Sequence, residues 1–205
     1  MKLQVAFDDV SIEQCLSILE TSADDIDIIE VGTLFIIRYG LEPVRIIRKL
    51  YPKKTILADP KIMDAPALIA GACFDAGTDI VTVMSAASEA IVKKTVAEAH
   101  SRHGKVFVDL LEVNDPAKMV SFYDSLGADI ICVHASKNAD LPPFDALREA
   151  LLCPHSAEIA IAGGISTSTI KEAAACGPDI VIVGSGVYRA DDPAAVIRLL
   201  KEAMV

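Results

Sequence analysis

Short apolar runs recur along the whole chain at a nearly constant interval, and this spacing constrains the fold more than any other feature. Each run is long enough for one buried strand, and the interval of about 25 residues is that of a strand followed by a crossover helix. Such a repeat predicts parallel strands alternating with helices. The eight runs are Leu3–Phe7, Ile26–Val31, Thr55–Ala58, Ile80–Val83, Val106–Leu110, Ile130–Val133, Ile159–Ala162 and Ile180–Val183.

The segments between the runs have the pattern of helices. Those over Ser88–His103 and Pro116–Leu126 each open on a capping residue or a proline. Glycines such as Gly77 and Gly177 stand shortly before the next run, where helices commonly end. We expect an α/β fold in which residues 1–205 form a single (β/α)8 TIM barrel. An open doubly wound sheet is the alternative, but eight regular units in a small chain favour closure.

Composition narrows the class of protein. The 205 residues are 52% hydrophobic, which is enough for a sizeable core, and the net charge of −10 argues against nucleic acid and anionic membranes as partners. No apolar stretch predicts a transmembrane helix or a signal peptide, so a cytoplasmic location is expected. The five cysteines are scattered without a CxxC pair, which argues against a disulfide framework and a zinc site.

The segment Asp59–Asp64 places two carboxylates around Lys61, directly after an apolar run. In a barrel the active site lies at the carboxyl ends of the strands. If the backbone stays extended, Asp59 and Lys61 project to the same side, and Asp64 falls in the following loop or helix. An ordinary loop salt bridge would explain the triplet on its own, so the other strand ends must decide.

Charged residues end several of the other runs. Asp8, Glu30, Asp109 and His134 occupy such positions, and in a barrel they become neighbours of Asp59. A cluster of carboxylates needs a compensating cation or protons. Lys61 supplies one positive charge, and Mg²⁺ held by Glu30 and Asp59, with water and substrate oxygens, could supply the rest. The alternative for Glu30 is a simple ion pair with Lys61.

The last two runs are followed by glycine turns. Gly163 and Gly164 come after the seventh run, and Gly184, Ser185 and Gly186 come after the eighth. Glycine lets backbone N–H groups approach an anion, and barrels commonly bind phosphate with these two loops. Tight turns need glycine in any case, so each turn alone is weak evidence. Together they predict a phosphate site.

His134 ends the sixth run and is the histidine best placed for proton transfer, because its ordinary pKa lies near neutrality. A satisfied histidine at the rim of the core is the simpler interpretation. The remaining histidines, His100, His103 and His155, fall on helix or loop surfaces.

These strand ends, taken together, resemble one known family. The segments Ala6–Asp8, Ile28–Thr33, Leu57–Asp64, Val108–Asp109, Val133–His134, Ala162–Ile165 and Ile182–Ser185 are similar to those of 3-hexulose-6-phosphate synthase and 3-keto-L-gulonate-6-phosphate decarboxylase. Both belong to the orotidine-5′-monophosphate decarboxylase superfamily. The resemblance runs from Met1 nearly to Val205, and its Asp-x-Lys-x-x-Asp motif is highly specific.

The resemblance implies a homodimer of barrels with shared active sites and a phosphorylated keto-sugar substrate. It implies that Glu30 and Asp59 hold Mg²⁺, that Lys61 contacts substrate oxygens and that Asp64 reaches the partner's site. Asp8 and Asp109 would bind substrate, the glycine turns its phosphate, and His134 would carry a proton. The expected reaction is the addition of formaldehyde to ribulose 5-phosphate through an enediolate.

A few positions separate the synthase from its relatives. Asp109 fits the synthases, whereas the decarboxylases have glutamate there. Lys137 stands where the decarboxylases have arginine. Pro60 and Pro66, by contrast, are departures of this chain from the family pattern, which has small or aliphatic residues at these motif-flanking positions. The alternatives are 3-keto-L-gulonate-6-phosphate decarboxylase and a non-catalytic barrel that only binds a sugar phosphate.

Overall fold

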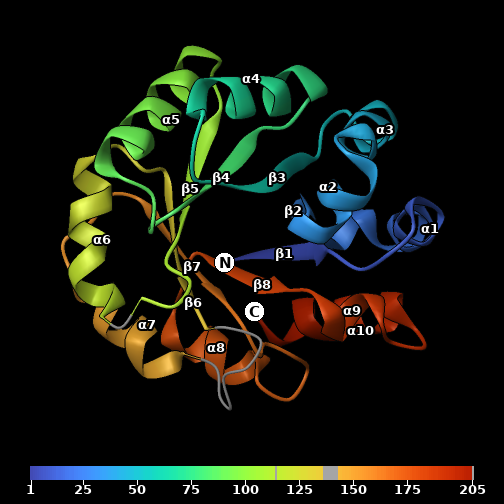
Figure 1. Cartoon of the computed structure of the whole chain (residues 1–205). Helices are drawn as coiled ribbons and strands as arrows, with labels where there is room; N and C mark the ends of the chain where they lie inside the picture. The colour runs from blue at the N-terminus through green and yellow to red at the C-terminus, as the bar shows by residue number, and fades with distance from the viewer. Residues whose placement is uncertain (114, 136–142, 205) are drawn as a thin grey trace.

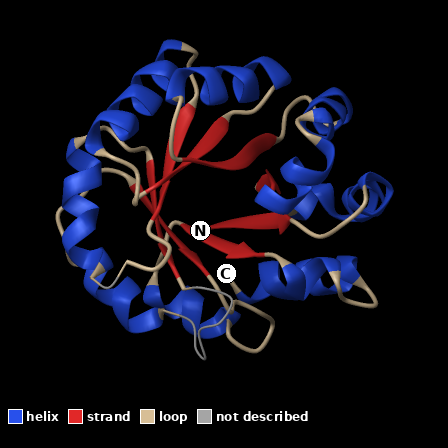
Figure 2. Ribbon diagram, viewed as in Figure 1, coloured by secondary structure: helices blue, strands red, loops and turns tan. Residues whose placement is uncertain are grey.

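The eight predicted strands form a closed barrel in the order β1 to β8, and every neighbouring pair is parallel. The structure is a computed structural model and describes residues 1–113, 115–135 and 143–204. Figure 2 shows the strands inside a ring of helices. This is the predicted (β/α)8 barrel, and the open-sheet alternative is excluded. The strands are β1 Lys2–Phe7, β2 Ile28–Val31, β3 Thr55–Ile62, β4 Ile80–Met84, β5 Lys105–Asp109, β6 Ile130–His134, β7 Glu158–Ala162 and β8 Ile180–Val183.

Helices connect successive strands around the outside of the barrel (Figure 1). The predicted helix ends are confirmed where a capping residue defines them. Helix α5 begins after Ser88, and helices α4 and α8 end at Gly77 and Gly177, which have a left-handed backbone conformation. A 3-10 turn, Ala23–Asp25, precedes β2. The helices are α1 Ile12–Ser22, α2 Thr33–Tyr39, α3 Glu42–Leu50, α4 Pro66–Ala76, α5 Glu89–Ser101, α6 Pro116–Ser125, α7 Phe144–Leu151, α8 Ile170–Cys176, α9 Ser185–Tyr188 and α10 Pro193–Ala203. None of the described helices is long and apolar enough to cross a membrane.

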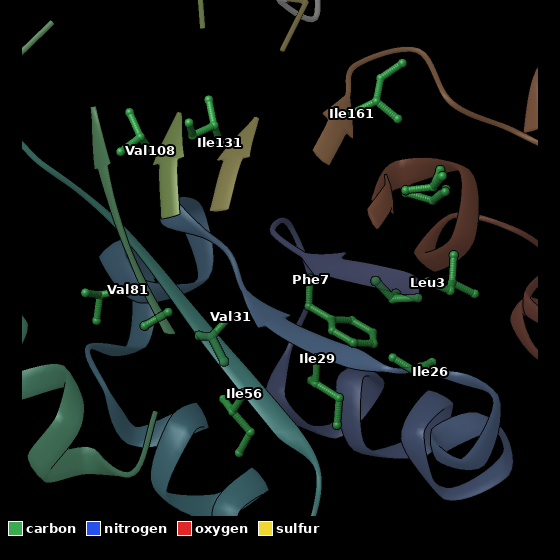
Figure 3. Packing of buried hydrophobic residues seen from close by; sticks show 14 of the residues in the cluster. Leu3, Phe7, Ile26, Ile29, Val31, Ile56, Val81, Val108, Ile131 and Ile161 are labelled. Carbon is green, nitrogen blue, oxygen red and sulfur yellow. The ribbon is translucent and has the colours of Figure 1, made fainter. Parts of the chain in front are cut away.

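Each strand buries both of its faces, which explains why the runs read as continuously apolar. One face packs against the helices, as Phe7, Ile29 and Ile56 do in Figure 3. The other face fills the barrel with a separate cluster that includes Ile28 and Phe107. Because side chains alternate along a strand, the positions that face inward near the carboxyl ends are the ones that reach the site.

β3 is longer than predicted. Its apolar run was expected to end at Ala58, but the strand continues to Ile62 and includes the charged motif. Its register against β4 shifts between Ala58 and Ile62, where four residues on β3 advance as far as two on β4. Pro60 lies in this bulge, where a missing N–H removes no ladder hydrogen bond. Bulges of this kind commonly re-aim side chains beside active sites.

Candidate active site

A cavity of about 450 Å³ opens at the carboxyl ends of the strands, where the sequence predicts the site. Its size is typical of a small-molecule site. The predicted residues from five strand ends and the two glycine turns converge on it. Those that line it are Asp8, Glu30, Asp59, Lys61, Asp109, His134, Gly163, Gly164, Gly184 and Ser185.

Lys61 adopts an unusual backbone conformation. Its φ of +48° lies in the left-handed region, so the extended backbone assumed from the sequence does not continue through the motif. The side chain of Thr82 on β4 accepts a hydrogen bond from the Lys61 N–H at 3.0 Å and secures the bulge. A lysine in this region costs about 1–2 kcal/mol, so strain is concentrated where the ammonium is aimed.

The Lys61 ammonium nevertheless lies between two buried carboxylates. Its Nζ is 3.1 Å from Asp59 Oδ2 and 2.8 Å from Asp109 Oδ2. Burial opposes the charged form of Lys61, but the charges of Asp59 and Asp109 outweigh it and raise the lysine pKa. The motif therefore does contain a salt bridge, but one inside a cavity with a permanently cationic lysine.

Asp109 joins Lys61 to His134. Its Oδ1 lies 2.9 Å from Nδ1 of His134 and also accepts the backbone N–H of Leu111. Burial acts to raise the Asp109 pKa, but the hydrogen bond and charge of His134 and the ammonium of Lys61 lower it overall. Both Asp109 oxygens thus have protein partners. In the structure Asp109 holds the two groups that flank it, and its direct contact with substrate stays a prediction.

Glu30 is buried beside Asp59 but is not the ion-pair partner of Lys61 in the described structure. Its Oε2 accepts a 2.6 Å hydrogen bond from Nε2 of Gln4. Burial, together with the negative charge of Asp59, raises the pKa of Glu30 to about 8. The raised pKa favours the protonated form of Glu30, whereas a bound cation would favour its carboxylate.

Asp8 lies over Gly32, the N-cap residue of α2. A Cβ on Gly32 would lie 2.4 Å from Asp8 Oδ1 and 2.8 Å from the carbonyl oxygen of Phe7. Glycine is therefore required at position 32 because the Asp8 side chain occupies the space. This contact directs Asp8 toward the cavity that it lines.

The two glycine turns come together on one side of the cavity. Gly163 and Gly164 have φ values of +95° and +70°, and a Cβ on Gly163 would lie 2.2 Å from the backbone oxygen of Ala135. Gly184 precedes α9, which begins at Ser185. The structure brings these turns together, as predicted for a phosphate site.

Asp64 is the one predicted site residue that does not line the cavity. It is exposed, and its Oδ1 accepts the N–H of Ala65, a second non-glycine residue in the left-handed region with a φ of +46°. Pro66 follows as the first residue of α4. Lys137, in the segment that distinguishes the synthases from the decarboxylases, lies outside the described residues.

Three polar residues at the site were missed from the sequence. Thr82 donates to Asp59 Oδ1 at 2.6 Å, and Thr33 donates to Asp59 Oδ2 at 2.8 Å. Gln4 holds Glu30. Threonine is common in strands and at helix starts, so Thr33 and Thr82 carry no distinctive signal. Gln4 did carry one, because it is the single polar residue within the run Leu3–Phe7.

The donor set fits a magnesium ion held partly by water and substrate. Glu30 and Asp59 are two hard carboxylate ligands, and within the described chain no group of three or more histidine, cysteine or acidic residues is arranged as a metal cage. Mg²⁺ is commonly bound through one or two carboxylates and keeps several waters. The cysteines Cys15, Cys73, Cys132, Cys153 and Cys176 are all free.

Comparison with known proteins shows to which family the chain is related. Residues 1–200 match the family model described as orotidine 5′-phosphate decarboxylase / HUMPS family. The chain is 35% identical to 3-hexulose-6-phosphate synthase 3 of Staphylococcus saprophyticus subsp. saprophyticus, with 100% of this chain and 99% of the relative covered. The 3-hexulose-6-phosphate synthase of Bacillus subtilis is also 35% identical, with the same coverage.

Solved structures give the same result. The crystal structure of 3-hexulose-6-phosphate synthase from Salmonella typhimurium superimposes with a TM-score of 0.95 at 38% identity, covering 100% of this chain and 98% of the other. A 3-keto-L-gulonate-6-phosphate decarboxylase from Vibrio cholerae shares the fold, with a TM-score of 0.83 over 99% of this chain and 96% of the other, but only 22% identity. The chain therefore belongs to the orotidine 5′-phosphate decarboxylase / HUMPS family.

Proposed function

We propose that this protein is a 3-hexulose-6-phosphate synthase, which joins formaldehyde to ribulose 5-phosphate through an enediolate. The observation that carries the proposal is the Lys61 ammonium, held 3.1 Å from Asp59 and 2.8 Å from Asp109 inside the cavity. A fixed positive charge at this place would stabilise negative charge that develops on adjacent substrate oxygens. Full-length identity of 35% to synthases supports this reaction over that of the more distant decarboxylases.

Lys61 is assigned to electrostatic stabilisation and not to proton removal. Its raised pKa keeps it protonated at neutral pH, so it has no lone pair with which to take a proton. His134 is the base, because Asp109 accepts its Nδ1–H and leaves Nε2 to face substrate. The pairing resembles the carboxylate–histidine arrangement that fixes the tautomer of a general base.

The reaction then follows in balanced steps. Nε2 of His134 removes a proton from C1 of ribulose 5-phosphate, and the electron pair of that C–H bond forms the C1–C2 double bond of the enediolate. The positive charge of Lys61 stabilises the oxygens. C1 then attacks the formaldehyde carbon, the C2 oxygen becomes a ketone, and the new alkoxide takes a proton from His134. The product is a six-carbon 3-keto sugar phosphate.

Glu30 and Asp59 are the residues that would hold a divalent cation, and we assign Mg²⁺ to them. When bound, the ion would act as a Lewis acid that withdraws charge from the substrate oxygens. Within the chain, Thr33 and Thr82 restrain both oxygens of Asp59 and so keep its carboxylate in place. Asp8 is assigned to the substrate hydroxyls, since Gly32 leaves space for it at the cavity wall.

The phosphate of the substrate is assigned to the two glycine turns. Gly163, Gly164, Gly184 and Ser185 surround one part of the cavity wall, and backbone N–H groups freed by positive φ values suit an anion. The group would lie opposite the carboxylates, which are the least favourable neighbours for a phosphate. This separation orients the sugar so that C1 and C2 reach Lys61 and His134.

We further propose a homodimer in which Asp64 enters the partner's site. Four exposed large apolar side chains lie on the elements around β3: Leu34 and Ile37 on α2, Met63 after the strand, and Leu68 on α4. Leu34 also lines the cavity, so this apolar surface is continuous with the cavity mouth. Exposed apolar surface of this kind marks protein–protein interfaces.

Subunit mixing tests the shared site. Homodimers of Lys61→Ala and of Asp64→Asn should each be inactive. A mixture allowed to exchange subunits should regain activity, because one site in each heterodimer then has both native residues. Absence of any regain, with subunit exchange verified by a mass-tagged subunit, would contradict the shared site.

A direct assay tests the function. Purified protein with Mg²⁺ should consume formaldehyde in the presence of ribulose 5-phosphate, with formation of the hexulose phosphate followed by NMR. It should release little or no CO₂ from 3-keto-L-gulonate 6-phosphate. CO₂ release faster than condensation would establish the decarboxylase alternative. Binding of ribulose 5-phosphate without either reaction would establish the non-catalytic barrel. The five free cysteines fit the reducing cytoplasm, where we place the enzyme.

A further inference from the structure

Gln4 is a buried amide at the floor of the cavity and has an apolar setting. It is 1% exposed and lies on β1, facing into the barrel two residues before Ala6, the register partner of Glu30. Its own register partners are Ile28 on β2 and Ile182 on β8. By pattern alone an aliphatic residue belongs at this position.

The two polar atoms of the Gln4 amide differ in their hydrogen bonding. Nε2 donates to Glu30 Oε2 at 2.6 Å, whereas Oε1 is buried and has no hydrogen-bond partner in the described part of the chain. A buried polar atom without a partner costs free energy that an aliphatic side chain would avoid. Packing alone therefore does not explain an amide at this position, and the one hydrogen bond that its side chain makes is with Glu30.

That contact leaves the second carboxylate oxygen of Glu30 without a hydrogen-bond partner in the described part of the chain. Oε2 is occupied by Gln4, while Oε1 has no hydrogen-bond partner among the described residues and Glu30 lines the cavity. Asp59 is held from its other sides by Thr33 and Thr82. Each carboxylate is thus anchored from behind, in the manner of the outer partners that orient metal ligands.

We propose that Gln4 is a positioning residue for the cation site: by holding Oε2 it presents Oε1 of Glu30 to a divalent cation shared with Asp59. The inference rests on the proposed function, since it takes Glu30 and Asp59 as the ligands. It adds a residue that does not touch substrate and that acts only through Glu30.

Mn²⁺ binding to the substrate-free protein tests the proposal, with free Mn²⁺ measured by electron paramagnetic resonance. Gln4→Met removes the donor with little change in volume and should weaken Mn²⁺ binding by about 10- to 100-fold, the usual effect of losing an outer partner. Its midpoint of unfolding in urea without metal should stay close to that of the wild-type protein, because removal of the unpaired Oε1 offsets the loss of the donor to Glu30 Oε2.

Thr78→Val is the matched control. Thr78 is the other residue of the described chain with a buried, unpartnered side-chain oxygen, and it lies before β4 at the opposite end of the barrel. Its replacement also removes a buried oxygen without a hydrogen-bond partner, so the unfolding midpoint should stay the same or rise. The affinity for Mn²⁺ should stay unchanged.

Two results would overturn the proposal. One is wild-type Mn²⁺ affinity in Gln4→Met. The other is a lower unfolding midpoint in Gln4→Met without one in Thr78→Val, including outright failure to fold, since the amide would then serve the fold. Glu30→Gln separates this inference from the proposed function. If that variant binds Mn²⁺ like the wild type, the assignment of Glu30 as a ligand fails; if only Gln4→Met does, the role of Gln4 alone fails.

Discussion

The two ends of the barrel both carry rows of carboxylates, but they hold them in different ways. At the amino end, Asp27, Asp79, Asp129 and Asp179 each precede an even-numbered strand, and each is followed by isoleucine. The Asp-Ile pair recurs about every 50 residues, once for every two strand–helix units. At the carboxyl end, Glu30, Asp59 and Asp109 gather in the cavity.

All four amino-end carboxylates accept backbone N–H groups, and three of them, Asp27, Asp79 and Asp129, also pair with Lys201, Arg48 and His100. Asp27 accepts the N–H of Leu3 at 2.7 Å and donates its own N–H to the oxygen of Leu3 at 3.0 Å. The other three repeat this exchange with one residue of the preceding strand: Asp79 with Ile56, Asp129 with Val106, and Asp179 with Ile159. Each aspartate thus closes a strand pair where the ladder begins.

At the other end the carboxylates bind mainly side chains inside the cavity, and their surroundings are strained or electrostatically unfavourable. Lys61 has a left-handed backbone, and the pKa of Glu30 is raised to about 8 by burial and by Asp59. The comparison indicates that one end of this barrel stabilises the fold while the other carries unfavourable charge for chemistry. Mutations at the two ends should therefore separate stability from activity.

Loss of the ammonium should have the largest effect. Lys61→Ala removes the group that stabilises charge on the substrate, so kcat/KM for hexulose phosphate formation should fall by about 10³-fold, at the upper end for one electrostatic donor. Far-UV circular dichroism should still show a folded barrel, because the amino end is intact. Lys93→Ala, which removes an exposed lysine paired with Glu89 on α5, is the control. Activity near that of Lys93→Ala would contradict the assignment.

The converse experiment is made at the amino end. Asp79→Ala leaves the N–H of Ile56 without its acceptor and Arg48 without its carboxylate partner. The free energy of unfolding in urea should fall by about 1–3 kcal/mol, the cost of an unpaired buried donor. kcat/KM at 25 °C should stay within about twofold of the wild type. A loss of activity as large as that of Lys61→Ala would erase the distinction between the two ends.

Gly32→Ala should have an intermediate effect at the carboxyl end. The added Cβ would lie 2.4 Å from Asp8 Oδ1 and must displace that side chain, so KM for ribulose 5-phosphate should rise by about tenfold, or ~1.4 kcal/mol. Gly177→Ala is the control, because it adds a Cβ at a φ of +82° with no atom within 4 Å. The control should lower stability without raising KM. Equal KM values in the two variants would show that Asp8 does not contact substrate.

The smallest effect is expected at Glu158, which pairs with Lys2 and Lys105 where β7 begins. Burial acts against it, but the hydrogen bonds and charges of the two lysines lower its pKa overall. A carboxyl group whose pKa is lower in the folded protein stabilises the fold at pH values above its pKa in the unfolded chain, which is about 4.5 for glutamate. This stabilisation is lost as the pH falls through the pKa of the folded protein. The unfolding free energy of Glu158→Gln should therefore lie at most about 1 kcal/mol below the wild type at pH 7. The difference in unfolding free energy between the variant and the wild type should disappear in acid. A difference that grows in acid would contradict a lowered pKa for Glu158.

The sequence predicted the barrel because parallel strands buried on both faces leave a plain apolar signal. It located Asp59, Lys61 and Asp109 at the site because strand ends converge in a barrel. The bulge at Pro60 was not foreseen, since apolar periodicity does not report register. The Asp-Ile repeat was overlooked because single aspartates before strands resemble ordinary turn residues. The role of Asp64 follows from the resemblance alone and involves a second subunit, so it stays a prediction.

The account depends most on the claim that this cavity makes an enediolate. Ribulose 5-phosphate can be incubated with the protein and Mg²⁺ in D₂O without formaldehyde, and the C1 protons followed by NMR. We expect one C1 proton to exchange for deuterium with the wild-type protein and neither to exchange with Lys61→Ala or without protein. If both C1 protons persist with folded wild-type protein that binds the sugar phosphate, the site does not form an enediolate and the central claim is wrong.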